Sequence, residues 1–251
     1  MNKEDTLFSK RLSDLAVRAD QKNIVLFSDF LNLNELNIFH SCAKDLSFIQ
    51  TRTFGGYEMA ERQIIAFIPD ALFYDWQYPI RVLRIEPSSK KYAEELTHRD
   101  YLGTILGLGI ERSTIGDILC DEEGAFVFCL DKIADYILSE LVRIKHTSVL
   151  VREVALDEIH YEPEFELIKG SVASVRLDTL LALAFSSSRS SLGGLIETGS
   201  VFVNGKLVTS NGYKVKEQDI ISVRGHGRFR YRGILSQTRK GRVFVEIEKY
   251  V

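Results

Sequence analysis

The sequence is poor in the features that mark exported, membrane-spanning or zinc-binding proteins. Its 251 residues include three cysteines, Cys42, Cys120 and Cys129, an odd number with no Cys-x-x-Cys pair. We therefore expect reduced core thiols in the cytosol rather than disulfides. No apolar run approaches the roughly 20 residues that span a bilayer, and the N-terminal stretch has no signal-peptide core. These absences predict a soluble, cytoplasmic protein with no membrane partner.

Catalytic and cofactor motifs are also missing. His98-Arg99-Asp100 resembles the kinase catalytic loop, but the metal-binding Asn expected five residues later is Ile105, and no glycine-rich phosphate loop precedes it. The glycines of residues 103–109 do not form a dinucleotide fingerprint, because its last glycine position is Arg112. The five histidines share no metal-ligand spacing with one another or with the cysteines. We therefore predict no catalytic residue, no cofactor and no metal.

Charge is distributed unevenly along the chain. The formal net charge is −3, with 45% hydrophobic and 27% charged residues, a composition typical of a globular protein. Residues 169–251 carry 14 lysines and arginines against 6 acidic residues, a net charge of +8, whereas residues 1–168 carry 18 against 29, a net charge of −11. The sequence therefore predicts a dipolar molecule whose C-terminal third attracts polyanions.

Hydrophobic periodicity predicts an α+β protein with three small domains, over residues 1–75, 76–168 and 169–251. The first is expected to be an α/β unit, with two helices over residues 5–20 and 33–45 and two strands over residues 48–54 and 63–68. The second follows a β-α-β-β-α-β order, with strands over residues 79–85, 115–120, 125–130 and 148–155. This order predicts a ferredoxin-like plait, the fold of a common RNA-recognition module.

Several residues of the central domain have specific expected roles. Thr97 and Asp100 are expected to form a capping box at the start of the first helix, and Asp131 to cap the second. Phe126 and Phe128 are candidates either for stacking RNA bases or for the core, and both interpretations stay open.

The C-terminal third combines two short helices with a tight hairpin. Leucines at helical spacing predict a helix that starts after Arg176, followed by a second helix that Ser187 or Ser188 caps. Asn204-Gly205 between two apolar runs predicts a type I′ turn, because both turn positions need positive φ. We expect this arrangement to bring together three basic residues, Arg176, Arg189 and Lys206.

This stretch, over residues 174–225, resembles the S-four domain, an RNA-binding module named after a small-subunit ribosomal protein. Gly193-Gly194 and Gln218-Asp219 depart from the family pattern, and two glycines inside a helix weaken it by about 1 kcal/mol each. The basic residues are expected to hold phosphates, the serines to offer hydroxyl contacts, and Asn204-Gly205 to shape the contact loop. The candidate RNA-binding residues here are Arg176, Asp178, Ser188, Arg189, Ser190, Asn204, Gly205 and Lys206.

A basic segment follows the S-four match. Residues 224–242 contain seven basic residues and no acidic one. Phe229 and Tyr231 alternate with arginines, so in a strand the rings would share one face and the arginines the other. This pattern is typical of a phosphate-facing surface above a buried side, and the alternative is a solvated charged surface. The additional RNA-binding candidates are Arg224, Arg228, Arg230 and Arg232.

Further motifs extend the resemblance to the entire chain. They are Gly55-Gly56-Tyr57, Ala60-Glu61-Arg62, His98-Arg99-Asp100-Tyr101-Leu102-Gly103, Leu108-Gly109-Ile110 and Ile115-Gly116-Asp117-Ile118. Together with a C-terminal S-four module they resemble the YlmH family of bacterial proteins. The resemblance implies an N-terminal α/β domain, a central RNA-binding plait, and association with the large ribosomal subunit and with stalled, tRNA-bearing nascent-chain complexes.

Two functions from different classes follow. The first is a non-catalytic RNA-binding translation factor that holds ribosomal RNA or tRNA phosphates, while its acidic first two-thirds faces a basic ribosomal protein or turns away from rRNA. The second is an RNA-modifying enzyme, a pseudouridine synthase or methyltransferase, anchored by the S-four domain. Such an enzyme needs a committed Asp or a Gly-rich cofactor loop, and residues 1–168 show neither. We therefore predict the first function, with Arg99 open as a surface group or an RNA contact.

Overall fold

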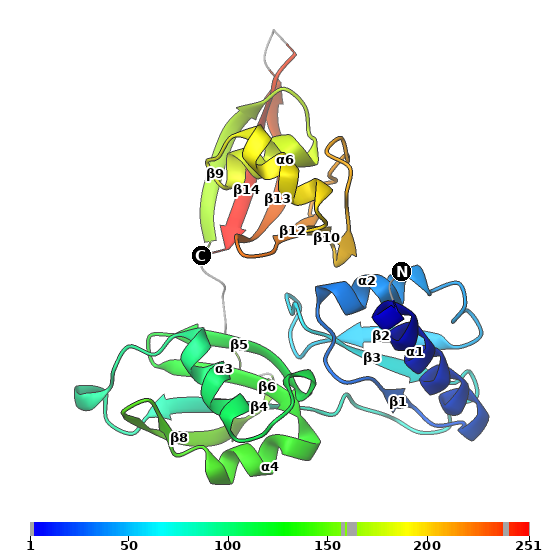
Figure 1. Cartoon of the computed structure of the whole chain (residues 1–251), viewed down its shortest axis with the longest axis vertical. Coiled ribbons are helices and arrows are strands. Elements are labelled where there is room, and N and C mark those ends of the chain that lie inside the picture. Colours follow the sequence, from blue (N-terminus) through cyan, green and yellow to red (C-terminus); the bar gives the residue numbers. More distant parts are fainter. Residues whose placement is uncertain (1–2, 157–158, 160–164, 238–240, 251) are drawn as a thin grey trace. The chain divides into compact units, whose positions relative to one another are not determined.

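The computed structural model of the chain describes residues 3–156, 159, 165–237 and 241–250 (Figure 1). These residues belong to two units, Met1–Tyr161 and Glu162–Val251. Each unit combines helices with antiparallel strands, which confirms the predicted α+β class. The further division of the first unit into two domains stays a prediction.

The N-terminal part of the first unit is a three-stranded antiparallel sheet with two helices on one face. Its elements are α1 (Lys3–Lys22), β1 (Leu26–Phe27), α2 (Leu33–Ser41), β2 (Gln50–Phe54) and β3 (Ile64–Ile68), in the strand order β1-β3-β2. Leu12 and Ala16 of α1 pack against Ile65 and Phe67 of β3. Both predicted helices and both predicted strands are present, although α2 ends at Ser41, before the predicted residue 45.

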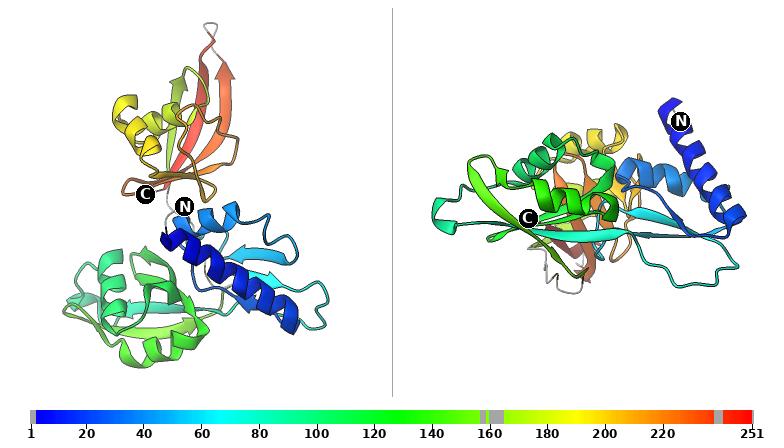
Figure 2. Two further views of the ribbon diagram at one scale, coloured as in Figure 1. Left: turned by 45° about the vertical axis from the view of Figure 1, so that its right-hand side comes forward. Right: turned by 90° about the horizontal axis from the view of Figure 1, so that it is seen from below.

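The rest of the first unit is a five-stranded antiparallel sheet whose two longer helices, green in Figure 2, cover one face. Its elements are β4 (Ile80–Pro87), η1 (Lys90–Tyr92), α3 (His98–Gly107), η2 (Arg112–Thr114), β5 (Ile115–Asp121), β6 (Gly124–Leu130), α4 (Asp131–Glu140), β7 (Arg143–Ile144) and β8 (Thr147–Val154). The strand order is β5-β6-β4-β8-β7. Apart from the short β7, the strands and α-helices follow the predicted β-α-β-β-α-β order.

The N-termini of α3 and α4 test the two predicted helix caps. Thr97 precedes α3, and its backbone N–H donates to the Asp100 carboxylate over 2.8 Å, which confirms the capping box. The predicted cap of α4 is wrong by one position, because Leu130 is the N-cap residue and Asp131 is already helical. The physical reason is that β6 runs directly into α4, so the last strand residue takes the capping position.

A buried cluster joins the two parts of the first unit. Phe30 packs with Phe128, which is fully buried and whose ring centroid lies 5.2 Å from that of Tyr57. Base stacking on Phe128 is therefore excluded in this fold, and Phe128 belongs to the core. Phe126 is half-buried, and the Arg84 guanidinium lies 4.4 Å from its ring centroid.

Asp117 connects the β2–β3 loop to β5. Its carboxylate accepts hydrogen bonds from the Tyr57 hydroxyl (2.9 Å), the Glu61 backbone N–H (2.7 Å) and the Arg62 backbone N–H (3.1 Å). Tyr57, Glu61 and Arg62 all come from the motifs that indicate the YlmH family, and so does Asp117. These residues therefore form one hydrogen-bonded network across the first unit.

Two arginines complete this network. The Arg62 guanidinium donates to the carbonyl oxygens of Ile115 and Phe30, each over 2.9 Å. Arg112 also donates to the carbonyl of Ile115. Burial lowers the pKa of Arg62, and burial together with the Arg62 charge lowers the pKa of Arg112 to about 10. We call Tyr57, Glu61, Arg62, Arg112 and Asp117 the Asp117 network.

The second unit is a six-stranded antiparallel sheet with two helices on one face. Its elements are β9 (Phe165–Val172), α5 (Leu177–Ala184), α6 (Arg189–Glu197), β10 (Val201–Val203), β11 (Lys206–Leu207), β12 (Ile220–Val223), β13 (Gly227–Gln237) and β14 (Val243–Tyr250), in the strand order β11-β10-β12-β13-β14-β9. Leu177, Leu180 and Leu181 of α5 are fully buried in a core that includes Val245 and Ile247. β9 pairs with β14 along its whole length, so it crosses the predicted domain boundary between residues 168 and 169.

The three cysteines are free thiols. Cys42 and Cys129 are buried and Cys120 is half-buried. Burial raises the pKa of Cys120 to about 11 and that of Cys129 to about 12, so both thiols stay protonated at neutral pH. This confirms the predicted unpaired core thiols. Among the residues that the structure describes, no helix has both the length and the apolar character to cross a membrane.

Candidate nucleic-acid interface

The start of α5 presents Arg176 to solvent beside a carboxylate. Arg176 is the N-cap residue of α5, and its guanidinium donates two hydrogen bonds of 3.0 Å to Asp178. The Arg176 side chain is 44% exposed, whereas that of Asp178 is only 13% exposed. Asp178 therefore orients the guanidinium, and its negative charge suits this supporting place better than a direct phosphate contact.

The hairpin between β10 and β11 is held by its own turn residues. Asn204 and Gly205 have φ angles of 48° and 76°, as a type I′ turn requires, which confirms the predicted turn. Asn204 Nδ2 donates to Asp219 Oδ1 over 2.8 Å, and the Ile220 backbone N–H donates to Asn204 Oδ1 over 2.9 Å. Both ends of the Asn204 amide are thus used inside the fold. Asn204 therefore shapes the loop that presents Lys206.

Sequence reasoning missed Lys214, a lysine that lies beside Arg176. Lys214 forms an antiparallel β-bridge with Arg176, and the Tyr213 carbonyl accepts a 2.9 Å hydrogen bond from the Leu177 backbone N–H. Lys206 and Lys214 are exposed, and no carboxylate among the described residues pairs with either. No sequence pattern marks Lys214, because the bridge joins residues that are far apart along the chain. We call Arg176, Lys214 and Lys206 the α5–hairpin surface: the β-bridge places Lys214 beside Arg176, and Lys206 is the exposed lysine of the β10–β11 hairpin, whose closeness to Arg176 stays a prediction.

The beginning of α6 carries three further candidates. Arg189 is the first residue of the helix, but the side chains of Arg189 and Ser190 lie outside the part of the chain that the structure describes. Ser188 directly precedes the helix and is exposed, and its carbonyl accepts the Leu192 backbone N–H over 3.3 Å. RNA contacts of these three residues stay predictions.

The basic strand β13 separates its side chains between two faces, as predicted. Phe229 and Tyr231 lie in the core with exposed fractions of 0% and 2%. Arg228, Arg230 and Arg232 therefore extend from the opposite face of the sheet, which α5 and α6 do not cover. We call this the helix-free face. It is a separate basic surface, because the core of the second unit lies between it and the helices.

All three arginines of the helix-free face, Arg228, Arg230 and Arg232, already have protein partners. Glu248 lies 3.8 Å from Arg230 and 3.4 Å from Arg232. The Arg228 guanidinium lies 5.0 Å from the ring centroid of Tyr250. Their charges are therefore partly compensated within the sheet, which weakens their attraction for phosphate.

Arg224 differs from these arginines. It directly follows β12, is exposed, and lies 5.4 Å from the ring centroid of Phe202. No carboxylate in the described ranges forms an ion pair with it. Among the four arginine candidates of this segment, Arg224, Arg228, Arg230 and Arg232, Arg224 is therefore the one whose charge is most available to an anionic ligand.

Three family models match the chain one after another. The model described as "YlmH, N-terminal" matches residues 4–72, and the model described as "Putative RNA-binding domain in YlmH" matches residues 75–169. The chain belongs to the YlmH family. A third model, "S4 domain", matches residues 175–221 and is the S-four domain that the hairpin and α5 indicated. In this YlmH-family chain the α5–hairpin surface lies within the S-four match.

A relative and a solved structure are also similar to this chain. A Bacillus subtilis (strain 168) protein named "Ribosome-associated protein quality control protein P2" is 27% identical over 197 residues, which cover 78% of this chain and 76% of the relative. A solved structure of "Cell division protein ylmH from Streptococcus pneumoniae" has a TM-score of 0.52 and 24% identity, and the match covers 63% of this chain and 95% of that one. The similarity to the solved structure shows that the two chains share a fold.

Proposed function

We propose that this YlmH-family chain is a non-catalytic RNA-binding translation factor that associates with the ribosome. The observation that carries this proposal is the α5–hairpin surface, where Lys206 and Lys214 are exposed without acidic partners in the described residues. Lysines and arginines that neutralise phosphates displace bound counterions, and this supplies sequence-independent affinity for RNA. The hydrogen bonds that hold Asn204 prepare the hairpin before RNA arrives.

The proposed role in ribosome-associated quality control also rests on the B. subtilis relative, whose name assigns that relative to this process. We propose that the chain binds large-subunit rRNA or tRNA on stalled nascent-chain complexes. The acidic character of residues 1–168 is suited to a basic ribosomal protein, or to an orientation away from rRNA while the second unit binds.

No observation favours the RNA-modifying alternative. The polar cluster of the first unit uses its Asp117 carboxylate to bind three protein donors. Among the described residues no three His, Cys, Asp or Glu side chains gather in a way that could hold a metal ion. Assays for pseudouridine and for methyl transfer from S-adenosylmethionine to ribosomal RNA test the alternative directly, and either product would overturn the proposal.

A salt titration of RNA binding tests the α5–hairpin surface. The double variant Arg176→Ala/Lys206→Ala should bind ribosomal RNA about tenfold more weakly than the unchanged chain. Its log-log salt slope should become less steep by about 0.7 for each phosphate of single-stranded RNA that the variant no longer neutralises. Lys206 has no acidic partner among the described residues, so only the loss of the exposed Arg176–Asp178 ion pair should affect stability, by less than about 1 kcal/mol.

Lys44→Ala is the matched control, because Lys44 is exposed on the first unit and lies in no predicted site. It should leave both affinity and slope unchanged. Co-sedimentation with isolated large ribosomal subunits should fall in the double variant and persist in the control. Unchanged RNA affinity in the double variant would refute the assignment of this surface.

A further inference from the structure

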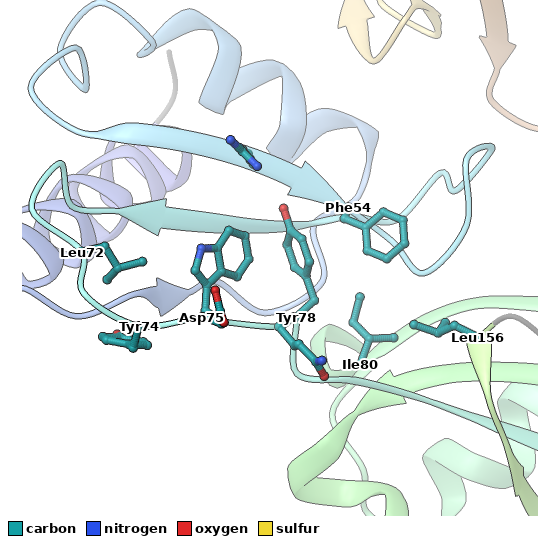
Figure 3. Close-up of a pocket in the computed structure, with 10 residues that line it drawn as sticks. Phe54, Leu72, Tyr74, Asp75, Tyr78, Ile80 and Leu156 are labelled. Carbon is teal, nitrogen blue, oxygen red and sulfur yellow. The ribbon is translucent and has the colours of Figure 1, made fainter.

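The first unit contains a pocket that the proposed S-four interface does not use. It lies on the face of the three-stranded sheet opposite α1 and α2, where the segment between β3 and β4 packs against β1 and β3 (Figure 3). The cavity volume is about 740 Å³, which is ample for a nucleotide. Four aromatic side chains line it, Phe54 from β2 and Tyr74, Trp76 and Tyr78 from the β3–β4 segment.

The rings of the pocket are held at fixed positions by one another. Trp76 and Tyr78 have centroids 5.1 Å apart in an edge-to-face arrangement, and Tyr78 lies 5.2 Å from Phe54. Phe27 of β1 packs behind them, 5.8 Å from both Trp76 and Tyr78. The Tyr74 hydroxyl accepts a 2.8 Å hydrogen bond from the Val25 backbone N–H, which ties the β3–β4 segment to the sheet. The pocket is therefore preformed.

Apart from the Tyr74 hydroxyl, four polar groups of the pocket form no hydrogen bond or ion pair within the described residues, although the Arg52 charge acts on Tyr78. This holds for the Arg52 guanidinium, the Asp75 carboxylate, the Trp76 indole N–H and the Tyr78 hydroxyl. Burial raises the pKa of Tyr78, so its hydroxyl stays a hydrogen-bond donor at neutral pH. One cation, one anion and two neutral donors thus border an aromatic surface.

We propose that this pocket binds an unstacked base of single-stranded RNA, with the base against Trp76 and Tyr78 and a neighbouring phosphate on Arg52. Aromatic side chains bind splayed bases by stacking, and a nearby cation tracks the backbone. Asp75 can accept a hydrogen bond from an exocyclic amino group of the base. The chemistry of the ligand is therefore a planar ring with hydrogen-bonding edges and an attached phosphate.

A proline-rich peptide is the competing occupant, since aromatic grooves also bind such segments. It offers neither a phosphate for Arg52 nor an amino-bearing planar ring for Asp75, so the pocket's polar groups favour the nucleotide. The inference extends the RNA-binding function proposed above to a second site and rests on it. The test must therefore separate a failure of the pocket from a failure of the α5–hairpin surface.

Trp76 is the only tryptophan of the chain, so tryptophan fluorescence reports on this pocket alone. The full chain is titrated with an unstructured RNA hexanucleotide, an RNA duplex, a nucleoside monophosphate and a proline-rich peptide. The hexanucleotide should quench the emission saturably, because a base stacks on the indole. The duplex should require at least tenfold higher concentrations because its bases are paired. The monophosphate should require them because it carries one phosphate but lacks the flanking nucleotides whose backbone and bases add contacts in a single strand.

Variants locate the effect within the pocket. Arg52→Gln removes the cation from an exposed strand position and should raise the hexanucleotide midpoint about fivefold. Arg18→Gln, an exposed arginine on α1, is the matched control and should leave the midpoint unchanged. Trp76→Leu lacks the fluorescent reporter, so its affinity is measured by competition against a labelled hexanucleotide. Its affinity for the hexanucleotide should fall by a similar or larger factor than that of Arg52→Gln.

The double variant Arg176→Ala/Lys206→Ala distinguishes the two sites. Saturable quenching by the hexanucleotide that persists in this variant supports the pocket independently of the α5–hairpin surface. Absence of quenching in the unchanged chain, equal midpoints for the hexanucleotide and the monophosphate, or quenching by the peptide alone would each overturn the RNA pocket. None of these outcomes would alter the salt-titration result for the S-four interface.

Discussion

The two units use their family motifs in opposite ways. In the first unit the motif residues Tyr57, Arg62 and Asp117 bind one another and the backbone. In the second unit the motif residues Arg176 and Lys206 are exposed. A recognisable motif thus marks an internal connection in one unit and a candidate contact surface in the other.

The difference follows from where the polar groups of each motif find their hydrogen-bond and charge partners. Half-buried donors and acceptors are largely cut off from water and need partners within the fold, so the Asp117 network directs its charges to the first unit's own backbone. Exposed lysines are satisfied by water and can exchange it for phosphate. Burial and partners, rather than the motif itself, therefore indicate which residues are available to RNA.

The largest expected effect comes from removing Asp117. Asp117→Ala leaves the backbone N–H groups of Glu61 and Arg62 without their acceptor, and it removes a carboxylate that stabilises the Arg62 and Arg112 charges. The free energy of unfolding of the first unit should fall by about 3 kcal/mol. Urea unfolding followed by circular dichroism measures this change.

Asp14→Ala is the matched control for this substitution. Asp14 is exposed on α1 and should be neutral to within about 0.5 kcal/mol. Because the comparison assigns Asp117 to the fold alone, folded Asp117→Ala protein should keep its affinity for ribosomal RNA. A stable Asp117→Ala variant that no longer binds RNA would show that the Asp117 network also takes part in RNA binding.

The next effect compares the two basic surfaces of the second unit. Lys206→Ala should weaken RNA binding about fivefold and flatten the salt slope, because Lys206 has no acidic partner in the described residues. Arg230→Ala should weaken it less than about twofold, because Glu248 already compensates part of that charge. Fluorescence anisotropy at several salt concentrations distinguishes them, and a larger loss for Arg230→Ala would place the main contact on the helix-free face.

A smaller effect concerns the departure of Gln218 from the S-four pattern. Gln218 has a φ of 68°, in the left-handed region that costs a residue with a side chain about 1 kcal/mol relative to glycine. Gln218→Gly should therefore raise the midpoint of thermal unfolding of the second unit, with a gain of up to about 1 kcal/mol. Gly194→Ala in α6 is a useful companion, because an added Cβ there meets no atom within 4 Å.

The smallest effect is expected in acid. The ion pair with Lys145, aided by hydrogen bonds from Thr97, lowers the pKa of Asp100 to about 2. The unfolded chain therefore takes up this proton first, so the contribution to stability is present above about pH 4 and is lost as the pH falls toward 2. Thermal midpoints between pH 5 and 2.5 should fall less steeply in Asp100→Asn. An unchanged pH dependence would show that the cap contributes nothing measurable.

Much of the fold could be predicted from local pattern. The Asn204-Gly205 turn, the Thr97 capping box and the alternation of Phe229 and Tyr231 with arginines depend on residues a few positions apart. The predicted cap at Asp131 failed by one position because a strand leads into the helix without a loop, and no local pattern reports that junction.

The candidate site could be predicted only in part. Arg176 and Lys206 are marked by the motif, whereas Lys214 joins Arg176 through a bridge between distant segments. The compensation of Arg230 by Glu248 likewise depends on strand pairing across β13 and β14. Such contacts arise from tertiary structure, so the number of arginines in the sequence overstated the charge available on the helix-free face.

The hydrogen bonds that hold Asn204 in the β10–β11 hairpin also affect the rate at which this asparagine deamidates. In an Asn-Gly pair the glycine backbone nitrogen can attack the asparagine side-chain carbonyl and expel ammonia, and water then opens the resulting succinimide to a carboxylate. Asn204 is protected because Asp219 and Ile220 hold its amide on both sides. Were the conversion to occur, an oxygen would face the Asp219 carboxylate and replace a hydrogen bond with repulsion. Mass spectrometry of stored protein should therefore show slower deamidation at Asn204 in the folded chain than in urea.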